Sequence, residues 1–389
     1  MRVLMTSISA PGHVTPLVPL AWALRGAGHE VVIGGQPNLM PTVRGAGLCG
    51  QPIGEAFDQL LHLRNILPGE ESPIEAWGRV VEPLYSTAAR TWATQAHRTV
   101  DEYLDFCRAW APDLIVAEPF EFCARLMGGV LDVPWVRHRI GLTGRAARFE
   151  ESAAEALAPV AGRLGLKEGA PEPVLTLDTC PPSFGRTDAA ARRPMRYVPY
   201  NGTGAVPDWA LAPRPGARRV CVSLGTQTLV LNGVPLLRRI IEAVRGIDGV
   251  EVVVTLTAAD RESLGDLPEG VRVVESLPLN LFLDRCDVVI HHGGAGSCLT
   301  ATAFGVPQLV VPQFLDQFEY GDRLAAAGAG ITLDSADKQN DVEGIRRAVG
   351  ELLDDPAHVR NARRLREEIQ AMPSPGETVA VLERLAVTG

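Results

Sequence analysis

Residues 2–33, RVLMTSISAPGHVTPLVPLAWALRGAGHEVVI, decide how this sequence is expected to fold. An apolar strand over Val3–Ile8 leads into a glycine-containing loop and a helix whose apolar positions recur at helical spacing, namely Leu17, Leu20, Ala21 and Leu24. The helix stops near Gly28, and a second strand, Glu30–Ile33, follows at once. A strand, a helix and a strand in this order predict a parallel sheet with a crossover helix.

The same pattern continues along the chain. Apolar strands at Leu114–Ala117 and Pro134–Val136 follow helical stretches, and Pro73–Trp110 is expected to be helical. Residues 199–217 are rich in proline and glycine and predict a linker. Beyond it the pattern repeats, with strands at 219–223, 250–254, 271–274, 288–291 and 308–311, and helices at 296–304 and from 341 onward. We expect an α/β protein of two doubly wound parallel-sheet domains, residues 1–205 and 218–375, that face a cleft.

Composition excludes several classes of function. The 389 residues carry 37 basic and 46 acidic side chains, a formal charge of −9, and the sequence has no block of Lys and Arg, so nucleic acid is not an expected partner. No apolar run reaches the roughly 18 residues that cross a bilayer, and the first residues do not form a signal peptide. We therefore expect a cytoplasmic protein that does not bind membranes.

The loop after the first strand carries a candidate catalytic base. Ligands of open α/β sheets bind beyond the carboxyl ends of the strands, and Ser9–His13 lies at such an end. An imidazole can take up a proton near neutral pH, so His13 is placed like a general base. Position alone fits equally well a histidine that caps the helix or packs under the loop.

A second loop predicts an anion site. Val289–Ser297 runs from a strand through a glycine-rich turn into a helix. The glycines Gly293, Gly294 and Gly296 let the backbone approach a ligand, the helix start presents free N–H groups, and His292 and Ser297 add donors. Such a loop suits a phosphate or diphosphate, although a tight turn also needs small residues. The strand end at 223–226 either adds hydroxyl and amide groups from Ser223, Gly225 and Thr226 to this site or is an ordinary turn.

Other phosphate-binding motifs are absent from the sequence. It contains no G-x-x-x-x-G-K-[ST], and Leu299 stands where the dinucleotide fingerprint that begins at Gly294 requires Gly or Ala. A nicotinamide-dependent oxidoreductase is therefore disfavoured. No D-x-D pair occurs, and the candidate phosphate loop holds no carboxylate, so neither a metal nor another cofactor is implied.

An adjacent carboxylate and amide, Asp316 and Gln317, begin another helix at the same edge of the cleft. Together they offer acceptors and donors in fixed directions, which suits a polyhydroxylated ligand. The alternative is that they only cap a helix over Asp316–Ala327.

Taken together and in this order, these segments resemble the family 1 glycosyltransferases of the GT-B fold, in particular the actinobacterial enzymes that attach deoxysugars to polyketides and related natural products. The resemblance spans nearly the whole chain and is carried by Gly12–Ala21, Gly28–Val31, Met195–Gly202, Ser223–Thr226, Leu277–Leu279, His292–Gly294 and Asp316-Gln317. It implies an inverting, metal-independent transfer from a nucleotide sugar. The second domain would hold the donor and the first domain the acceptor, with the C-terminal helix at 376–389 returning to the first domain.

The resemblance also implies a role for each matching residue. His13 would deprotonate the acceptor, and Glu118 aligns with the carboxylate that orients this histidine, where an Asp is usual. Leu279 would lie against the base through its backbone, and Asp316 with Gln317 would hold sugar hydroxyls. The diphosphate would contact Ser223, Gly225, Thr226, His292, Gly293, Gly294, Gly296 and Ser297.

One departure from the family pattern concerns the donor. Relatives that use uridine donors commonly carry a Glu three residues after the Ser of the loop, where it binds the ribose hydroxyls, and here that position is Thr300. A carboxylate would lack a partner on deoxyribose, so the smaller residue predicts a dTDP-deoxysugar.

The acceptor is expected to be an apolar aglycone, either an aromatic polyketide or a macrolide. Candidate wall residues, which ordinary core packing explains equally well, are Phe57, Leu61, Trp77, Tyr85 and Trp92. Two alternatives stay open: C-glycosylation of an aromatic ring carbon, and a noncatalytic partner protein of the same fold. Whether the chain forms a homodimer is open as well.

Overall fold

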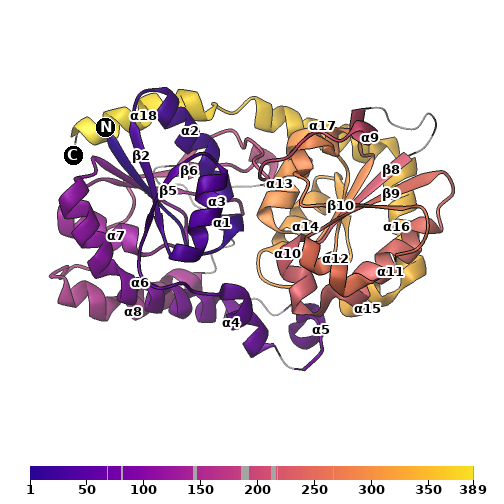
Figure 1. The fold of residues 1–389 in the computed structure, drawn as a ribbon, viewed down its shortest axis with the longest axis horizontal. Coiled ribbons are helices and arrows are strands. Elements are labelled where there is room, and N and C mark those ends of the chain that lie inside the picture. The colour runs from indigo at the N-terminus through magenta and orange to yellow at the C-terminus, as the bar shows by residue number, and fades with distance from the viewer. Residues whose placement is uncertain are drawn as a thin grey trace.

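The computed structural model describes residues 1–67, 69–79, 82–142, 147–184, 192–211, 216, 218–265 and 267–388. Two α/β domains lie side by side, and each is built on its own parallel sheet with helices on both faces (Figure 1). The predicted architecture of two doubly wound parallel-sheet domains is confirmed by these two sheets.

The first sheet has seven strands within the described residues, in the order β3-β2-β1-β4-β5-β6-β7. All neighbouring strands pair in parallel, and their apolar runs are buried because helices cover both faces of the sheet. The strands are β1 (Arg2–Thr6), β2 (Glu30–Gly35), β3 (Cys49–Pro52), β4 (Leu114–Ala117), β5 (Trp135–His138), β6 (Leu175–Asp178) and β7 (Arg192–Pro194). The α-helices are α1 (Pro11–Val14), α2 (Val18–Gly26), α3 (Met40–Gly45), α4 (Gln59–Ile66), α5 (Pro73–Trp77), α6 (Glu82–Trp110), α7 (Cys123–Leu131) and α8 (Ala147–Arg163).

The second sheet has six parallel strands within the described residues, in the order β10-β9-β8-β11-β12-β13. They are β8 (Arg218–Ser223), β9 (Val250–Leu256), β10 (Val271–Glu275), β11 (Val288–His291), β12 (Gln308–Val310) and β13 (Gly330–Thr332). The α-helices are α9 (Asp208–Leu211), α10 (Gly225–Thr228), α11 (Val234–Arg245), α12 (Ala258–Leu264), α13 (Ala295–Phe304), α14 (Gln317–Ala326), α15 (Ala336–Asn340), α16 (Val342–Asp354), α17 (Pro356–Gln370) and α18 (Pro375–Thr388). A π-turn, η4 (Leu229–Gly233), joins α10 to α11, and a 3-10 turn, η5 (Leu279–Leu281), follows β10.

The strand order of each sheet reverses beside its first strand, and this reversal places the loops that matter. In the first sheet β1 pairs with both β2 and β4, with Thr6 opposite Ala117. In the second, β8 pairs with β9 and β11, with Ser223 opposite His291. Ligands of doubly wound folds bind at such switch points, where two adjacent strand ends open a crevice.

The C-terminal helix returns to the first domain. In Figure 1 the yellow α18 lies beside α2, far from the C-terminal domain that precedes it in the sequence. Its Val379 and Leu382 belong to the same buried cluster as Leu17, Leu20 and Leu24. Burial of an aliphatic side chain contributes roughly 1.5–3 kcal/mol, so this helix stabilises the first domain.

Several predicted boundaries were wrong. The first strand ends at Thr6 rather than Ile8, because the Ile8 N–H turns away to donate to the Glu118 carboxylate. The following helix begins at Pro11, which fixes a helical φ, so His13 lies inside α1 and not before it. The predicted helix 73–110 is interrupted, since Gly78 (φ +56°) ends α5. Part of the predicted linker, residues 212–215 and 217, lies outside the described residues.

Among the helices that the structure describes, none combines the length and the apolar character needed to cross a bilayer.

The buried imidazole of His138 should make stability depend on pH. Burial at the end of β5 lowers the pKa of His138 to about 4, below the usual 6.5. Between pH 6.5 and pH 4 the imidazole of His138 is therefore protonated in the unfolded chain but neutral in the folded chain. The free energy of unfolding decreases as the pH falls through this range. When the pH falls from 7 to 5, the free energy of unfolding of His138→Leu should decrease by about 2 kcal/mol less than that of the wild type. Urea denaturation at the two pH values measures this difference. A matched variant at an exposed position, His97→Leu, should show the same pH dependence of the free energy of unfolding as the wild type. The prediction is contradicted if this free energy decreases equally in all three proteins.

Candidate active site

A cavity of about 540 Å³ lies between the two domains and collects most of the residues that the sequence singled out. It sits over the carboxyl ends of β1, β8, β11 and β12, where both switch points face each other. Predicted residues that line it are, from the first domain, His13, Trp77, Tyr85 and Trp92, and from the second, Gly225, Thr226, His292, Gly294, Gly296, Ser297, Asp316 and Gln317.

His13 and Glu118 form a hydrogen-bonded pair at the first switch point. His13 Nδ1 lies 3.0 Å from Glu118 Oε2, although the residues are 105 positions apart. A carboxylate accepts hydrogen bonds, so Nδ1 carries the ring proton, and Nε2 keeps the lone pair with which it can take a proton. The ring is part-exposed at 19% and packs edge-on against Phe120 at 5.2 Å between centroids, which leaves it open to the cavity.

Backbone N–H groups hold the carboxylate of Glu118 in place. The Glu118 carboxylate is fully buried, and it accepts the N–H of Ile8 (3.3 Å) at Oε1 and that of Phe120 (3.0 Å) at Oε2. With His13 added, the carboxylate has three donors. It is therefore held in one orientation and fixes the histidine ring in turn.

The glycine-rich loop opens the first turn of α13 toward the cavity. Gly294 is the N-cap of α13 and no side chain caps the helix there, so the first-turn N–H groups are available to a ligand. Gly296 and Ser297 line the cavity in this turn. The positive end of the helix dipole points the same way, which makes the loop an anion site.

His292 fills a space that two glycines leave free. A Cβ on Gly225 would lie 2.6 Å from Cε1 of His292, and a Cβ on Gly294 would lie 2.3 Å from its Nε2. The imidazole is thus clamped between the loops that follow β8 and β11. Burial lowers the pKa of His292 to about 3, so the ring is neutral and offers a hydrogen bond rather than a charge.

A buried network holds the loop from behind. The Gly293 N–H donates to His291 Nδ1 at 3.0 Å, and His291 Nε2 lies 2.8 Å from Gln308 Oε1. The Gln308 amide donates onward to Thr302 at 3.0 Å. Burial lowers the pKa of His291 to about 4, which keeps this ring neutral as well. Sequence reasoning treated His291 only as a strand residue.

Asp316 and Gln317 lie at the start of α14 and line the cavity. Burial raises the pKa of Asp316 to about 7, partly offset by the nearby His13. Gln317 Oε1 accepts the backbone N–H of Gln313 at 2.8 Å, so this amide also shapes its own loop. A backbone contact joins the donor loops, since a Cβ on Gly293 would lie 2.7 Å from the Gln317 carbonyl oxygen.

Four predicted donor residues lie behind the cavity wall instead of lining it: Ser223, Leu279, Gly293 and Thr300. Thr300 is 0% exposed, and its hydroxyl lies 3.1 Å from Asn201 Nδ2 and 3.3 Å from the Tyr197 hydroxyl. Asn201 also accepts the N–H of Asn280, which lies beside Leu279 in η5. Nucleoside contacts of Leu279 and Thr300 stay predictions.

The acceptor side of the cavity corrects two predictions. Trp77, Tyr85 and Trp92 line it, but Phe57 packs behind the wall against Trp92, and Leu61 is 55% exposed on the outer side of α4. The helical spacing of α4 decides this, because Leu60 and Leu63 line the cavity while Leu61 points elsewhere. The sequence analysis missed other apolar lining residues, namely Ile66, Leu84, Phe120, Ile140, Phe314 and Leu315.

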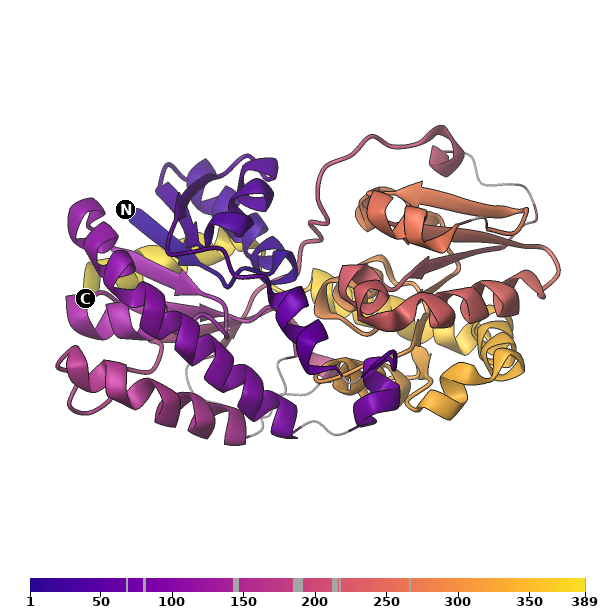
Figure 2. The ribbon, with the colours of Figure 1, turned by 60° about the horizontal axis from the view of Figure 1, so that its bottom comes forward.

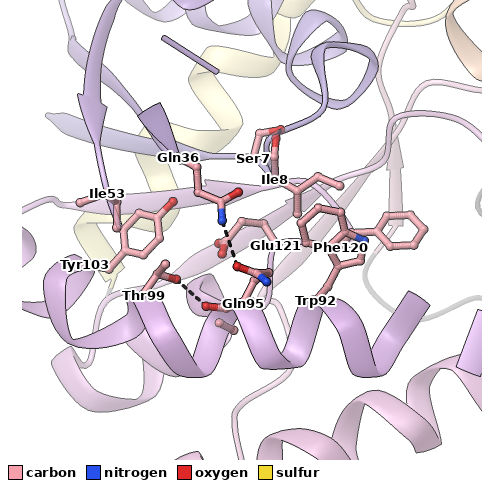
Figure 3. Close-up of a pocket in the computed structure, with 11 residues that line it drawn as sticks. Ser7, Ile8, Gln36, Ile53, Trp92, Gln95, Thr99, Tyr103, Phe120 and Glu121 are labelled. Atoms are coloured by element: carbon pink, nitrogen blue, oxygen red, sulfur yellow. Dashed lines mark hydrogen bonds between the residues drawn. The ribbon is translucent and has the colours of Figure 1, made fainter. Parts of the chain in front are cut away.

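A smaller polar chamber lies behind this wall (Figure 3). It measures about 20 Å³, which suits one water molecule rather than an aglycone. Gln36 donates to Gln95 at 3.2 Å inside it, while Trp92 and Phe120 form part of both this chamber and the large cavity. The aglycone therefore has to be sought in the large cavity.

Comparisons with known proteins point to one family. Residues 22–225 match the N-terminal domain model of the erythromycin biosynthesis protein CIII-like family, and residues 238–385 match its C-terminal domain model. An L-demethylnoviosyl transferase of Streptomyces niveus is 38% identical over 96% of each chain. An aklavinone 7-beta-L-rhodosaminyltransferase of Streptomyces galilaeus is 35% identical over 99% of this chain and 96% of its own.

Solved structures agree with these relatives. The spinosyn rhamnosyltransferase SpnG, complexed with thymidine diphosphate, is 40% identical and superimposes with a TM-score of 0.87 over 98% of this chain and 100% of its own. The glycosyltransferase SsfS6 of Streptomyces sp. SF2575, also complexed with thymidine diphosphate, is 33% identical with a TM-score of 0.81 over 99% of each chain. SpnG has also been solved with the spinosyn aglycone.

Proposed function

The chain belongs to the erythromycin biosynthesis protein CIII-like family of GT-B glycosyltransferases, and on that premise we propose that it transfers a deoxysugar from a dTDP-sugar to a hydroxyl group of an apolar aglycone with inversion. The observation that carries the proposal is the His13–Glu118 pair, which faces the anion site and Asp316 across one cavity. The proton acceptor and the nucleotide-sugar site therefore lie on opposite sides of one cavity, where a sugar can be transferred from the nucleotide to an acceptor hydroxyl.

The relatives decide between the broader alternatives. They are antibiotic-sugar transferases, so the chain is a glycosyltransferase and the noncatalytic partner hypothesis is set aside. Their names do not favour C-glycosylation either.

In the proposed reaction His13 acts as the general base. Nε2 removes the proton of the acceptor hydroxyl while its oxygen attacks the anomeric carbon. The bond from that carbon to the diphosphate oxygen breaks, and the electron pair leaves with dTDP. Attack from the side opposite the leaving group inverts the configuration. Glu118 holds Nδ1–H and stabilises the imidazolium that forms.

The second domain would stabilise the departing diphosphate without a metal. The loop from His292 to Ser297 contains no carboxylate that would hold a divalent ion. The N–H groups of the first turn of α13, the Ser297 hydroxyl and the neutral His292 ring point toward the cavity where the negative charge would develop. Preorganised donors of this kind account for a large share of catalysis in many enzymes.

Two features support a dTDP-sugar as donor. Solved relatives hold thymidine diphosphate. The buried Thr300 brings no carboxylate to the nucleoside side, and its hydroxyl is already engaged by Asn201 and Tyr197. A 2′-hydroxyl would therefore gain no charged partner from this position.

The lining of the acceptor half supports an apolar aglycone. Trp77, Tyr85 and Trp92 come from helices α5 and α6, and Phe314 faces them from the other domain. A solved relative, SpnG, binds the spinosyn aglycone.

Isothermal titration with dTDP and with UDP tests the donor assignment. We expect dTDP to bind about ten-fold more tightly, because Thr300 brings no carboxylate that would repay the desolvation of a ribose 2′-hydroxyl. Adding a chelator should leave the dTDP affinity unchanged. UDP binding as tight as that of dTDP, or a loss of dTDP binding with the chelator, would contradict the proposal.

A further inference from the structure

One segment of the first domain crosses the cleft and lies on the second domain. Residues 69–79, which we call the strap, stand between α4 and α6 in the sequence and contain α5. In Figure 1 the violet α5 lies below the C-terminal domain, beside α10 and α15, and Figure 2 shows it against the orange elements of the same domain from another side. The strap is therefore covalently part of one domain and packed on the other.

The first end of the strap is bound near the diphosphate loop. Asn232 Nδ2 donates to the carbonyl of Glu71 at 3.0 Å. Asn232 lies in η4, directly after α10 with its predicted diphosphate residues Gly225 and Thr226. This end of the strap is therefore bonded to η4, which directly follows the predicted diphosphate residues in the sequence.

The other end is bound to the helix that carries the sugar residues. The Arg79 guanidinium pairs with the carboxylate of Asp322 and lies 3.4 Å from that of Asp334. It also stacks over the Phe318 ring at 5.5 Å. Phe318 and Asp322 are on α14, which begins immediately after Asp316.

Between these anchors the strap builds part of the acceptor wall. Trp77 lines the cavity and meets the Phe314 ring edge-on, with 6.5 Å between centroids. A capping box stiffens α5, since the Ser72 N–H donates to Glu75 Oε2 at 2.9 Å; this bond and that from the Ser72 hydroxyl lower the pKa of Glu75. A short helix with both ends held by the other domain fixes the indole of Trp77 in place.

We propose that Arg79 is a positioning residue for the acceptor: by pairing with Asp322 on α14 it holds the strap against the donor domain and completes the apolar wall at Trp77. The inference rests on the proposed function for the identity of the ligands, but the anchoring itself does not. The acceptor pocket is complete only while the strap is docked. Loss of the anchor should therefore weaken acceptor binding and leave donor binding alone.

Steady-state kinetics with aklavinone as acceptor and dTDP-rhamnose as donor test the acceptor role. In Arg79→Gln and in Asp322→Asn we expect the KM for aklavinone to rise about five-fold, with kcat, donor KM and dTDP affinity within two-fold of the wild type. Arg79→Lys keeps a positive charge between Asp322 and Asp334 and should hold the acceptor KM within two-fold of the wild type. Arg108→Gln removes an exposed arginine whose partner among the described residues is Asp105 on α6, and it should change none of these quantities.

Hydrogen exchange in the absence of any ligand tests the anchor. The N–H groups of Glu75, Ala76 and Gly78 are hydrogen-bonded within α5, so they report whether the strap stays folded on its support. Their exchange should accelerate at least five-fold in Arg79→Gln and not in Arg108→Gln. Unchanged exchange, or accelerated exchange with an unchanged acceptor KM, overturns the inference. If the wild type fails to bind dTDP but the α5 N–H groups exchange faster in Arg79→Gln, the proposed function is contradicted. The anchor is still supported in that case.

Discussion

Replacing His13 with alanine is expected to lower kcat about a thousand-fold while the affinity for dTDP stays within two-fold of the wild type. A positioned general base contributes roughly 10²–10⁴ in rate. Glu118 holds His13 through Nδ1, and no hydrogen bond engages Nε2 within the described part of the chain. The cavity carries the anion site on its opposite wall. The loss should therefore fall on the chemical step, which single-turnover measurements with saturating donor would isolate.

His62 supplies a matched control for this experiment. It lines the same cavity on the acceptor side, but the structure gives its ring no carboxylate partner among the described residues. His62→Ala should change kcat by less than three-fold. If His13→Ala kept a tenth or more of the wild-type kcat, another group would have to serve as the base.

Replacing His292 with alanine is expected to weaken dTDP binding about 30-fold, measured by calorimetry. A hydrogen bond to a charged group contributes roughly 1.5–3 kcal/mol, and about 2 kcal/mol corresponds to this change in affinity. The imidazole lies between Gly225 and Gly294, and neither position has room for a Cβ beside it. Alanine would therefore leave a gap in the anion site that neither loop fills.

The same titration on His62→Ala should give the wild-type dTDP affinity, because His62 belongs to the acceptor wall. A His292→Ala protein that is folded by circular dichroism and binds dTDP as tightly as the wild type would remove His292 from the donor site. The diphosphate would then depend on the helix-end N–H groups and Ser297 alone.

The sequence by itself determined the architecture, because the central strands carry apolar runs that are buried on both faces. Strand β4 (Leu114–Ala117) and strand β11 (Val288–His291) were predicted to the residue. The predicted chemistry also followed from position, since His292 comes directly after β11 and His13 lies in the first helical turn that follows β1 and its loop. Parallel strands end at one edge of a sheet, so a residue just after a central strand is placed near a site without further information.

Edge strands and helix faces were harder to predict. Strands β3, β6, β7 and β13 were missed because none of them carries an uninterrupted apolar run: β3 and β7 contain glycine, proline or charge, and β6 and β13 mix apolar residues with polar residues or glycine. Phe57 and Leu61 were assigned to the acceptor wall from composition alone. Which face of a short helix meets a cavity depends on its partners, and these partners are remote in the sequence.

Only the tertiary structure decided how the two halves of the site meet. The pairing of β1 with β4 brings Glu118 to His13 across 105 positions, and no local pattern encodes that distance. Thr300 stays a predicted nucleoside contact, and the structure adds that its hydroxyl accepts a hydrogen bond from Asn201 of the predicted linker. Residues 73–79 of the strap were predicted as part of one long helix, whereas Arg79 reaches α14 of the other domain. Strands and turns arise from short-range preferences of the backbone, while these contacts depend on the packing of whole domains, which sets distances between residues that the sequence keeps far apart.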